Sequence, residues 1–472
     1  MLYQTEHAGK AYQNPILRIE SGSRFTASLD NALPEPTIIH WHGLHTPAAM
    51  DGHPASTIAP GGRYDYDFTV RNRGGTYWYH THAHGLTAKQ AYQGLASFFL
   101  VDDDDQRRLS KALDLRLGVT GLPLVIQDKQ FDAQGKLRYQ PNAQESMMGW
   151  LGDMVLANLT LNAVQTVTPR TYRLRLLNGS NARIYRLAFI TGRKQLNFTV
   201  IGTDGGLIER PKRRPKPFSP QGSASMSCWM PAKSSPARTS FSKAWRSIPR
   251  KTKDLPCPAC RREWQAWTTA PGTRRQARPR HGCRWVWRSM CSSSRSLRGK
   301  RILPGTLSKV SPISIQGATQ RKIELSLENM CFLINGRTFV MDEIAFDVKR
   351  GTVEVWSISN PELGMPHPMH IHGFSFQVLE RLNSPHQVSS SARFGKGRTA
   401  GDLGWKDTVL AWPGETVRIA IDFTNDFPGN QTYLLHCHNL EHEDAGNDDQ
   451  LSRARLKTRT APTSTCGQRR SC

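Results

Sequence analysis

The same pattern of residues occurs near each end of the chain. Pro60-Gly61, Phe68-Thr69 and Tyr77-x-x-His80-x-His82 return in the same order as Pro413-Gly414, Phe423-Thr424 and Tyr433-x-x-His436-x-His438. A His-x-His-Gly motif precedes each copy, at 40–43 and at 370–373. Because self-similar sequences fold into self-similar units, the repeat predicts a related domain at each end, built on the same strand framework.

The residues between the motifs favour β-structure. Apolar and polar side chains alternate over 171–176, 352–358 and 416–421, as expected of half-buried antiparallel strands. Turn signals such as Asn178-Gly179 and Pro413-Gly414 separate such runs. A length of 472 residues suggests about three domains. We therefore expect an all-β chain of several sandwich-like domains.

The run His436-Cys437-His438 predicts two metal sites that share one peptide. Successive side chains of a strand point to opposite faces, so Cys437 would face one way and both histidines the other. Thiolate and imidazole together are ligands that suit copper. Such a peptide could carry single electrons from a mononuclear copper to a second metal cluster.

Other His-x-His motifs indicate where that second cluster would form. The chain has 16 His, for which chance would give about half of one His-x-His pair. It has five, in clusters at the two ends of the chain: His40-Trp41-His42, the pairs in His80-Thr81-His82-Ala83-His84, His370-Ile371-His372 and His436-Cys437-His438. A chance origin is therefore a poor explanation, and the clusters predict a shared metal centre.

These motifs resemble the copper-binding signatures of the multicopper oxidases, the family of laccases, ascorbate oxidase, bilirubin oxidase and bacterial cuprous oxidases. The resemblance covers about 10–210 and 320–446. It implies cupredoxin-like Greek-key β-sandwich domains at 1–103, 104–320 and 321–446. The first and last would share the copper cluster at their interface, and the middle one would act as a spacer between them.

The resemblance also implies a ligand set for four copper ions. The type-2 copper would be held by His40 and His370; the type-3 pair by His42, His80, His82, His372, His436 and His438; and the type-1 copper by His367, Cys437 and His442. The other histidines match no ligand position and are expected to be surface or packing residues: His7, His45, His53, His84, His281 and His386. His84 follows a ligand pair, so it is also a candidate for orienting a bound imidazole from behind.

The implied activity is that of a copper-dependent oxidoreductase, which oxidises phenolic or aromatic substrates, or metal ions, one electron at a time and reduces dioxygen to water. Electrons would enter through His367 or His442. Glu443 resembles the acid that relays protons in bacterial relatives, although a solvated surface acid is the alternative. The catalytic residues would therefore be Cys437, His436, His438 and Glu443.

The identity of the electron donor is less well encoded. Cuprous oxidases often carry a methionine-rich insert, because thioether suits Cu(I). This chain has 12 Met, and Met147-Met148 is the nearest approach to such a cluster. A laccase-like oxidation of phenols is therefore expected first, and Cu(I) oxidation for copper homeostasis second.

The cellular location is inferred from the resemblance alone, which implies a periplasmic or secreted protein. Residues 1–7 show neither the basic nor the apolar region of a signal peptide. We expect no membrane span, because no apolar stretch is long enough. We also expect a monomer.

Two segments carry the basic character of the chain. The formal charge is +25, yet 211–300 holds 22 Lys and Arg against 2 Asp and Glu, and 451–472 holds 6 against none. The family pattern is lost after Arg210 and again after Gly446. We hypothesise that both segments are out-of-frame translation; a basic, disordered insert and tail is the alternative. We expect no nucleic-acid partner, because no recognised module is present, and no zinc site at Cys257-x-x-Cys260, which lacks a second pair.

The aberrant tail bears on the type-1 site. In family members with a methionine axial ligand, that methionine lies ten residues after the cysteine, where this chain has Asn447. The tail, 447–472, would also lack the last strand of the sandwich, so the last domain would be incomplete. The aberrant stretch at 211–300 would likewise leave the middle domain incomplete. A catalytically defective relative that still binds copper is therefore the second functional hypothesis.

Overall fold

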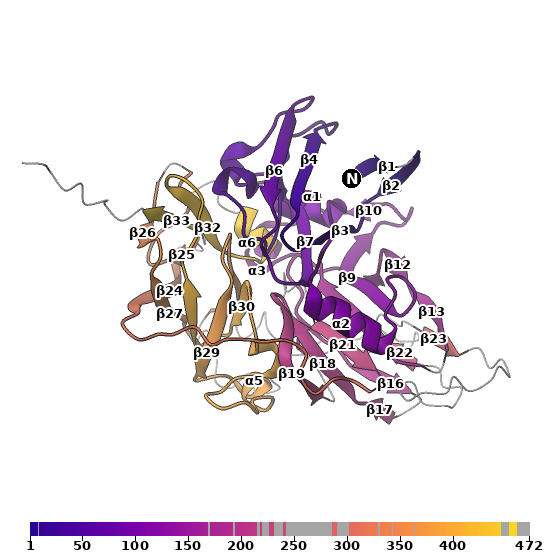
Figure 1. The fold of residues 1–472 in the computed structure, drawn as a ribbon. Coiled ribbons are helices and arrows are strands. Elements are labelled where there is room, and N and C mark those ends of the chain that lie inside the picture. Colours follow the sequence, from indigo (N-terminus) through magenta and orange to yellow (C-terminus); the bar gives the residue numbers. More distant parts are fainter. Residues whose placement is uncertain are drawn as a thin grey trace, which may run out of the picture.

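A computed structural model of the chain describes residues 1–7, 9–168, 170–191, 194–214, 218–219, 226–230, 239–241, 286–289, 302–328, 331–341, 343–362, 364–444 and 453–459. Strands dominate it, and the few helices are short (Figure 1). The all-β prediction is therefore confirmed. No helix in these described residues is long and apolar enough to cross a membrane.

The first sandwich follows an N-terminal hairpin of β1 and β2. Its sheets have the orders β3-β8-β7-β5 and β4-β6. The elements are β1 (Gln4–His7), β2 (Lys10–Gln13), β3 (Leu17–Glu20), β4 (Arg24–Asp30), β5 (Ile39–His40), η1 (Ala48–Met50), η2 (Pro54–Ser56), β6 (Arg63–Thr69), β7 (Gly75–Thr81), α1 (Thr87–Gln93), β8 (Ala96–Asp102) and α2 (Asp104–Leu113).

The middle sandwich has one large sheet, β12-β11-β9-β14-β21-β18-β19 with β10 beside β9, and a second sheet, β13-β23-β22-β16-β17. A short pair, β15 and β20, completes it. The elements are β9 (Gly121–Phe131), β10 (Leu137–Arg138), α3 (Ala143–Met148), β11 (Met154–Ala157), β12 (Thr160–Leu161), β13 (Val164–Val167), β14 (Tyr172–Asn178), β15 (Tyr185–Arg186), β16 (Phe189–Thr191), β17 (Lys194–Leu196), β18 (Phe198–Thr203), β19 (Gly206–Arg214), β20 (Phe218–Ser219), β21 (Met226–Met230), β22 (Thr239–Phe241) and β23 (Val286–Ser289).

The last sandwich packs two sheets, β25-β24-β27-β31-β29 and β26-β33-β32-β28-β30. The elements are β24 (Thr319–Glu328), β25 (Cys331–Ile334), β26 (Phe346–Lys349), β27 (Val353–Ser359), β28 (His367–Ile371), β29 (Phe376–Leu382), α5 (His386–Ser389), η4 (Ala400–Asp402), β30 (Thr408–Ala411), β31 (Thr416–Asp422), β32 (Gln431–Cys437), α6 (Leu440–Asp444) and β33 (Arg453–Arg459).

The alternation read from the sequence places side chains on the faces of these strands. In β31, Val417, Ile419 and Ile421 are fully buried in the core of the last sandwich. Thr416 and Arg418, on either side of Val417, are partly exposed. Each apolar side chain of this row removes its surface from water, which stabilises the fold by roughly 1.5–3 kcal/mol per residue. The core thereby fixes the register of the strands that carry the histidines.

The internal repeat is reproduced in the strand pairing. In the first sandwich β5 pairs antiparallel with β7, with His40 opposite His80. In the last sandwich β28 pairs antiparallel with β32, with His370 opposite His436. The two ends of the chain therefore present equivalent histidines at equivalent places in the sheet, as the repeat predicted.

The tail differs from expectation. Arg453–Arg459 forms β33, which pairs antiparallel with β32 from Gln431↔Thr458 to His436↔Arg453 and parallel with β26. The last sandwich therefore has a strand beside β32, where we expected none. The physical reason is that this edge of β32 offers backbone N–H and C=O groups, with which any extended segment can pair.

The basic segment 211–300 also contributes strands. Met226–Met230 lies between β14 and β18 in the large sheet, and Val286–Ser289 pairs with β13 and β22. These two stretches are strands, which differs from the alternative of a disordered insert at these positions. Residues 211–214 complete β19, and β20 and β22 also lie in this segment. Its other residues lie outside the described ranges, and these include Cys257, Cys260 and His281. The out-of-frame hypothesis concerns the gene and remains a prediction, which resequencing would test.

Candidate metal centre

The predicted ligands converge into compact groups of donor atoms. Among the described residues, five groups of His, Cys or Asp have ligand atoms that all lie within 4.8 Å of one another, and every member is buried. The groups are His40, His42 and His370; His42, His80 and His438; His82, His372 and His436; His40, Asp51 and His372; and His367, Cys437 and His442. All eleven predicted ligands are thus brought together, eight of them at the boundary of the first and last sandwiches.

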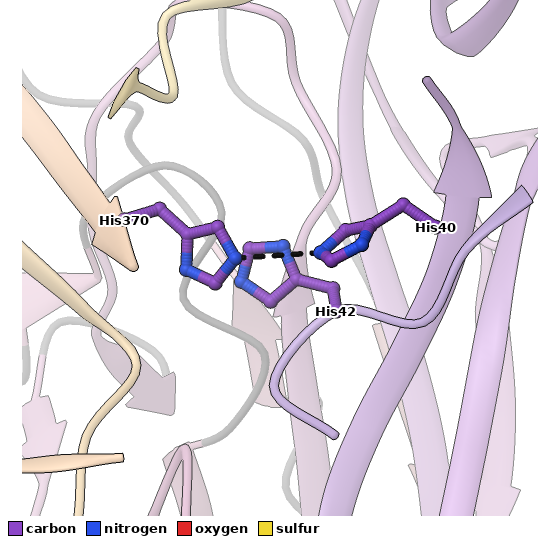
Figure 2. A group of neighbouring side chains, drawn as sticks. All are labelled: His40, His42 and His370. Atoms are coloured by element: carbon purple, nitrogen blue, oxygen red, sulfur yellow. Dashed lines mark hydrogen bonds between the residues drawn. The ribbon is translucent and has the colours of Figure 1, made fainter. Parts of the chain in front are cut away.

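The first group joins the two ends of the chain. His40 Nε2 and His370 Nε2 face each other at 3.4 Å, and the ring of His42 stacks on that of His370 with centroids 3.7 Å apart (Figure 2). His40 and His42 come from β5 and the loop after it, whereas His370 comes from β28. The site therefore exists only when the two sandwiches are docked.

The thiol group occupies a separate place. Cys437 Sγ lies 3.3 Å from His367 Nδ1 and 3.6 Å from His442 Nδ1, and the amide of Asn439 donates to the sulfur at 3.5 Å. Its chain neighbour His436 instead has its Nε2 3.0 Å from His372 Nε2. Alternation along β32 thus sends Cys437 and His436 to two different groups, as the sequence predicted.

Hydrogen bonds from the far side of the rings leave nitrogen lone pairs facing inward. His40 Nδ1 lies 2.7 Å from the carbonyl oxygen of Asp51, and His370 Nδ1 lies 2.8 Å from that of Asp407. Carbonyl oxygens only accept, so both Nδ1 atoms carry the proton and both Nε2 atoms are lone pairs. Two lone pairs that face each other at 3.4 Å need a cation between them. The donor set therefore fits a metal ion.

His80 and His42 show the same feature. His80 Nδ1 is 2.7 Å from the carbonyl oxygen of Thr81, and its Nε2 has no hydrogen-bond partner among the described residues. His42 is turned the other way: its Nε2 contacts Asp407 Oδ1 at 3.2 Å, which leaves Nδ1 without a described partner. A buried ring nitrogen without a partner costs free energy unless a ligand engages it.

Burial keeps these groups neutral. It lowers the pKa of His40 to about 3 and those of His367 and His438 to about 4, mainly because a charged imidazole would lose its hydration. Burial raises the pKa of the Cys437 thiol to about 12. The imidazoles are therefore ready to bind a metal as they stand, whereas the thiolate forms only when a cation compensates its charge.

Comparison with known proteins shows the family of this chain. Two family models described as multicopper oxidase match 6–106 and 310–448. The multicopper oxidase mco of Staphylococcus haemolyticus is 30% identical over 440 residues, which cover 93% of this chain and 81% of the relative.

The chain belongs to the multicopper oxidase family.

Other relatives agree with this assignment. The laccase of Bacillus subtilis is 28% identical over 443 residues, covering 86% of this chain and 78% of the laccase. The crystal structure of the McoA multicopper oxidase from Aquifex aeolicus superposes with a TM-score of 0.79 at 35% identity, covering 97% of this chain and 94% of that structure. The predicted cupredoxin-like sandwiches and the predicted copper-dependent oxidase class are thereby confirmed.

Buried carboxylates that the sequence did not reveal also lie among these histidines. Asp51 Oδ2 lies 2.7 Å from His372 Nδ1, and Asp407 Oδ1 lies 3.2 Å from His42 Nε2. Both residues are at most 1% exposed. A single aspartate in a loop has no spacing that marks it. A weak signal existed at Gly43, where a Cβ atom would lie 2.5 Å from Asp407 Oδ2, so the position requires glycine.

The remaining predicted residues fall as follows. Glu443 is fully buried, so the alternative of a solvated surface acid is wrong. His45 packs between the sandwiches, with its Nδ1 2.5 Å from the carbonyl oxygen of Gly373, and His53 is also buried. The suggested orienting role of His84 remains a prediction. Asn447, at the position of the axial methionine in some family members, lies outside the described residues.

Proposed function

We propose that this multicopper oxidase binds four copper ions and passes electrons from a small donor to dioxygen. His40 and His370 would hold the type-2 ion, and His367, Cys437 and His442 the type-1 ion. The type-3 pair would be held by two groups of three: His42, His80 and His438, and His82, His372 and His436. The observation that carries the proposal is the position of Cys437 in one group while the adjacent His436 lies in another.

Copper bound at these groups supplies one-electron acceptance from the donor and four-electron delivery to dioxygen. The chain supplies the connection: Cys437 is covalently linked through one peptide to each neighbour, His436 and His438. It also excludes bulk water, because each of the eight histidines between the first and last sandwiches is at most 1% exposed.

Electron uptake is proposed at the His367 edge of the thiol group. His367 retains 4% of its surface, whereas His442 is fully buried. Phe332 stacks on His442 with ring centroids 4.1 Å apart, and the Nε2 of His442 donates to the carbonyl oxygen of Met147 at 2.8 Å. A small aromatic donor can therefore approach the His367 side more closely.

Proton delivery is proposed at Glu443. Its Oε1 lies 3.3 Å from His82 Nε2, and its Oε2 lies 3.4 Å from His436 Nδ1. The carboxyl group is the buried acid that touches both of these rings, so it can hold a proton beside the place where oxygen would be reduced.

The proposed donor is a phenol or aromatic amine. Cu(I) is ranked second because a methionine-rich segment would favour it, and Met147-Met148 is the only adjacent methionine pair of the sequence. A periplasmic or secreted location, and a part in copper homeostasis if Cu(I) is the donor, follow from the family and are proposals as well.

Oxygen uptake by the copper-loaded protein tests the function. With a phenolic donor we expect one dioxygen consumed for every four electrons, without release of peroxide. Turnover on Cu(I) under the same conditions ranks the donors. Copper-loaded protein that consumes no oxygen with either donor would refute the proposed function and favour the catalytically defective alternative.

A further inference from the structure

The short helix α6 carries His442 and is held by the middle sandwich. Glu441, one residue before His442, is 3% exposed and accepts three hydrogen bonds. Asn181 Nδ2 and the hydroxyl of Tyr139 donate to its Oε1 at 2.6 and 3.0 Å, and the amide of Trp150 donates to its Oε2 at 2.9 Å. All three donors belong to the middle sandwich.

Further contacts join the same elements. The amide of Leu440 donates to the carbonyl oxygen of Asn181 at 3.1 Å, and His442 Nε2 donates to that of Met147 at 2.8 Å. Gly149, which follows α3, lies so close to Asn439 that a Cβ atom on it would be 2.7 Å from Asn439 Nδ2. In Figure 1, α3 and α6 lie together near the centre, where the three sandwiches meet.

The other end of α6 is fixed to the first sandwich. Asp444 accepts hydrogen bonds from the amides of Thr87 and Ala88, at the start of α1, at 2.9 and 2.7 Å. The helix is thus anchored by one carboxylate to each of the other sandwiches, and the ligand lies between the two anchors. The middle sandwich is therefore more than the spacer that the sequence suggested.

We propose that Glu441 is a positioning residue of the type-1 site: by binding Asn181, Tyr139 and Trp150 it sets the place of His442 relative to Cys437. The inference rests on the proposed assignment of His367, Cys437 and His442 to the type-1 copper. Its physical basis is that adjacent residues of a helix move together, so a shift of Glu441 shifts His442. The 3.6 Å separation of His442 Nδ1 from Cys437 Sγ then changes.

Glu441→Gln is the direct test. The amide keeps the size of the carboxylate, but it has only one oxygen. If that oxygen keeps the bonds from Asn181 and Tyr139, the new NH₂ group faces the amide of Trp150, and two donors repel each other. We expect a shifted thiolate-to-copper absorption band, a changed type-1 reduction potential and about tenfold slower reduction by a donor, with the copper content unchanged.

Tyr139→Phe is a second test that does not alter the ligand helix. It removes one of the three donors to Glu441 and should shift the band and the potential in the same direction, by less. In the double variant the two effects should be less than additive, because both act through one hydrogen-bonded cluster.

Glu354→Gln is the matched control. Glu354 is also 3% exposed and lies in the last sandwich, but it bonds to Arg321 and to Trp356 Nε1. Its substitution should lower stability and leave the absorption band and the potential as in the wild type.

The outcomes separate the two proposals. A copper-loaded wild type without a blue band would refute the type-1 assignment itself. A blue wild type whose band and potential are unchanged in Glu441→Gln would overturn only the role of Glu441. Equal changes in Glu354→Gln would overturn it too, since the effect would then be general destabilisation. If Glu441→Gln does not fold, Tyr139→Phe decides by the same readouts.

Discussion

His40 and His370 are 330 residues apart in the chain, yet their Nε2 atoms lie 3.4 Å from each other (Figure 2). Each ring is held from behind by a backbone carbonyl, that of Asp51 for His40 and that of Asp407 for His370. Both nitrogens are thereby presented as lone pairs to one point between the sandwiches. A shared cation would bind the two ends of the chain to each other.

Loss of one of these rings should remove one copper and leave the thiol site intact. For His370→Ala we expect copper content to fall by about one ion per chain, oxygen uptake to cease and the blue band to remain, because Cys437 belongs to another group. Metal analysis and absorption measure this. His386→Ala, which changes an exposed histidine, is the control and should match the wild type. A loss of the blue band in His370→Ala alone would contradict the separate assignment of the two groups.

The carboxylate of Asp407 should strengthen copper binding at His42. Its Oδ1 accepts from His42 Nε2 and from the hydroxyl of Thr408, at 3.2 and 2.8 Å. We expect Asp407→Ala to weaken copper affinity by about 10–100-fold, because the ring loses the bond that sets its tautomer. Asp407→Asn should lose less, since an amide oxygen still accepts. Competition with a chelator measures the affinity, and equal losses in the two variants would count against this role.

Lys129 should make stability depend on pH in the alkaline range. Burial lowers its pKa to about 8 from 10.5. Between these values the folded chain has released the proton while the unfolded chain still binds it, so stability rises with pH, by about 3 kcal/mol over the whole interval. Above pH 10.5 and below pH 8 the effect of Lys129 is flat. Lys129→Met should remove this rise in denaturant unfolding between pH 8 and 10.5. An unchanged difference between variant and wild type across that range would refute the assignment.

The strands and the histidine clusters were predictable because their signals lie in short stretches of sequence. Alternation marks β31, and the two-residue spacing of His436 and His438 marks the separation of Cys437 from its neighbours. The repeat even anticipated that His40 and His370 occupy equivalent positions. The alternation and the His436–His438 spacing depend only on the two-residue period of a strand. The equivalence of the two ends follows from the repeat, and the ligand set was implied by the family resemblance.

The supporting residues could not be predicted, because their roles depend on which sandwiches meet. Asp51 and Asp407 are single aspartates in loops, and Glu441 finds its donors 260 to 302 residues away in the sequence. The edge strand β33 was missed for a related reason: its residues carry no family pattern, and the pairing groups are supplied by β32.

The visible absorption spectrum of the copper-loaded chain tests the central claim most directly, with Cys437→Ser beside it. The arrangement of His367, Cys437 and His442 predicts an intense blue band from thiolate-to-copper charge transfer in the wild type. In Cys437→Ser we expect that band to vanish while most of the copper stays bound at the histidine groups. A wild type that binds copper without the blue band would contradict the claim that Cys437 joins a type-1 site to the oxygen-reducing cluster.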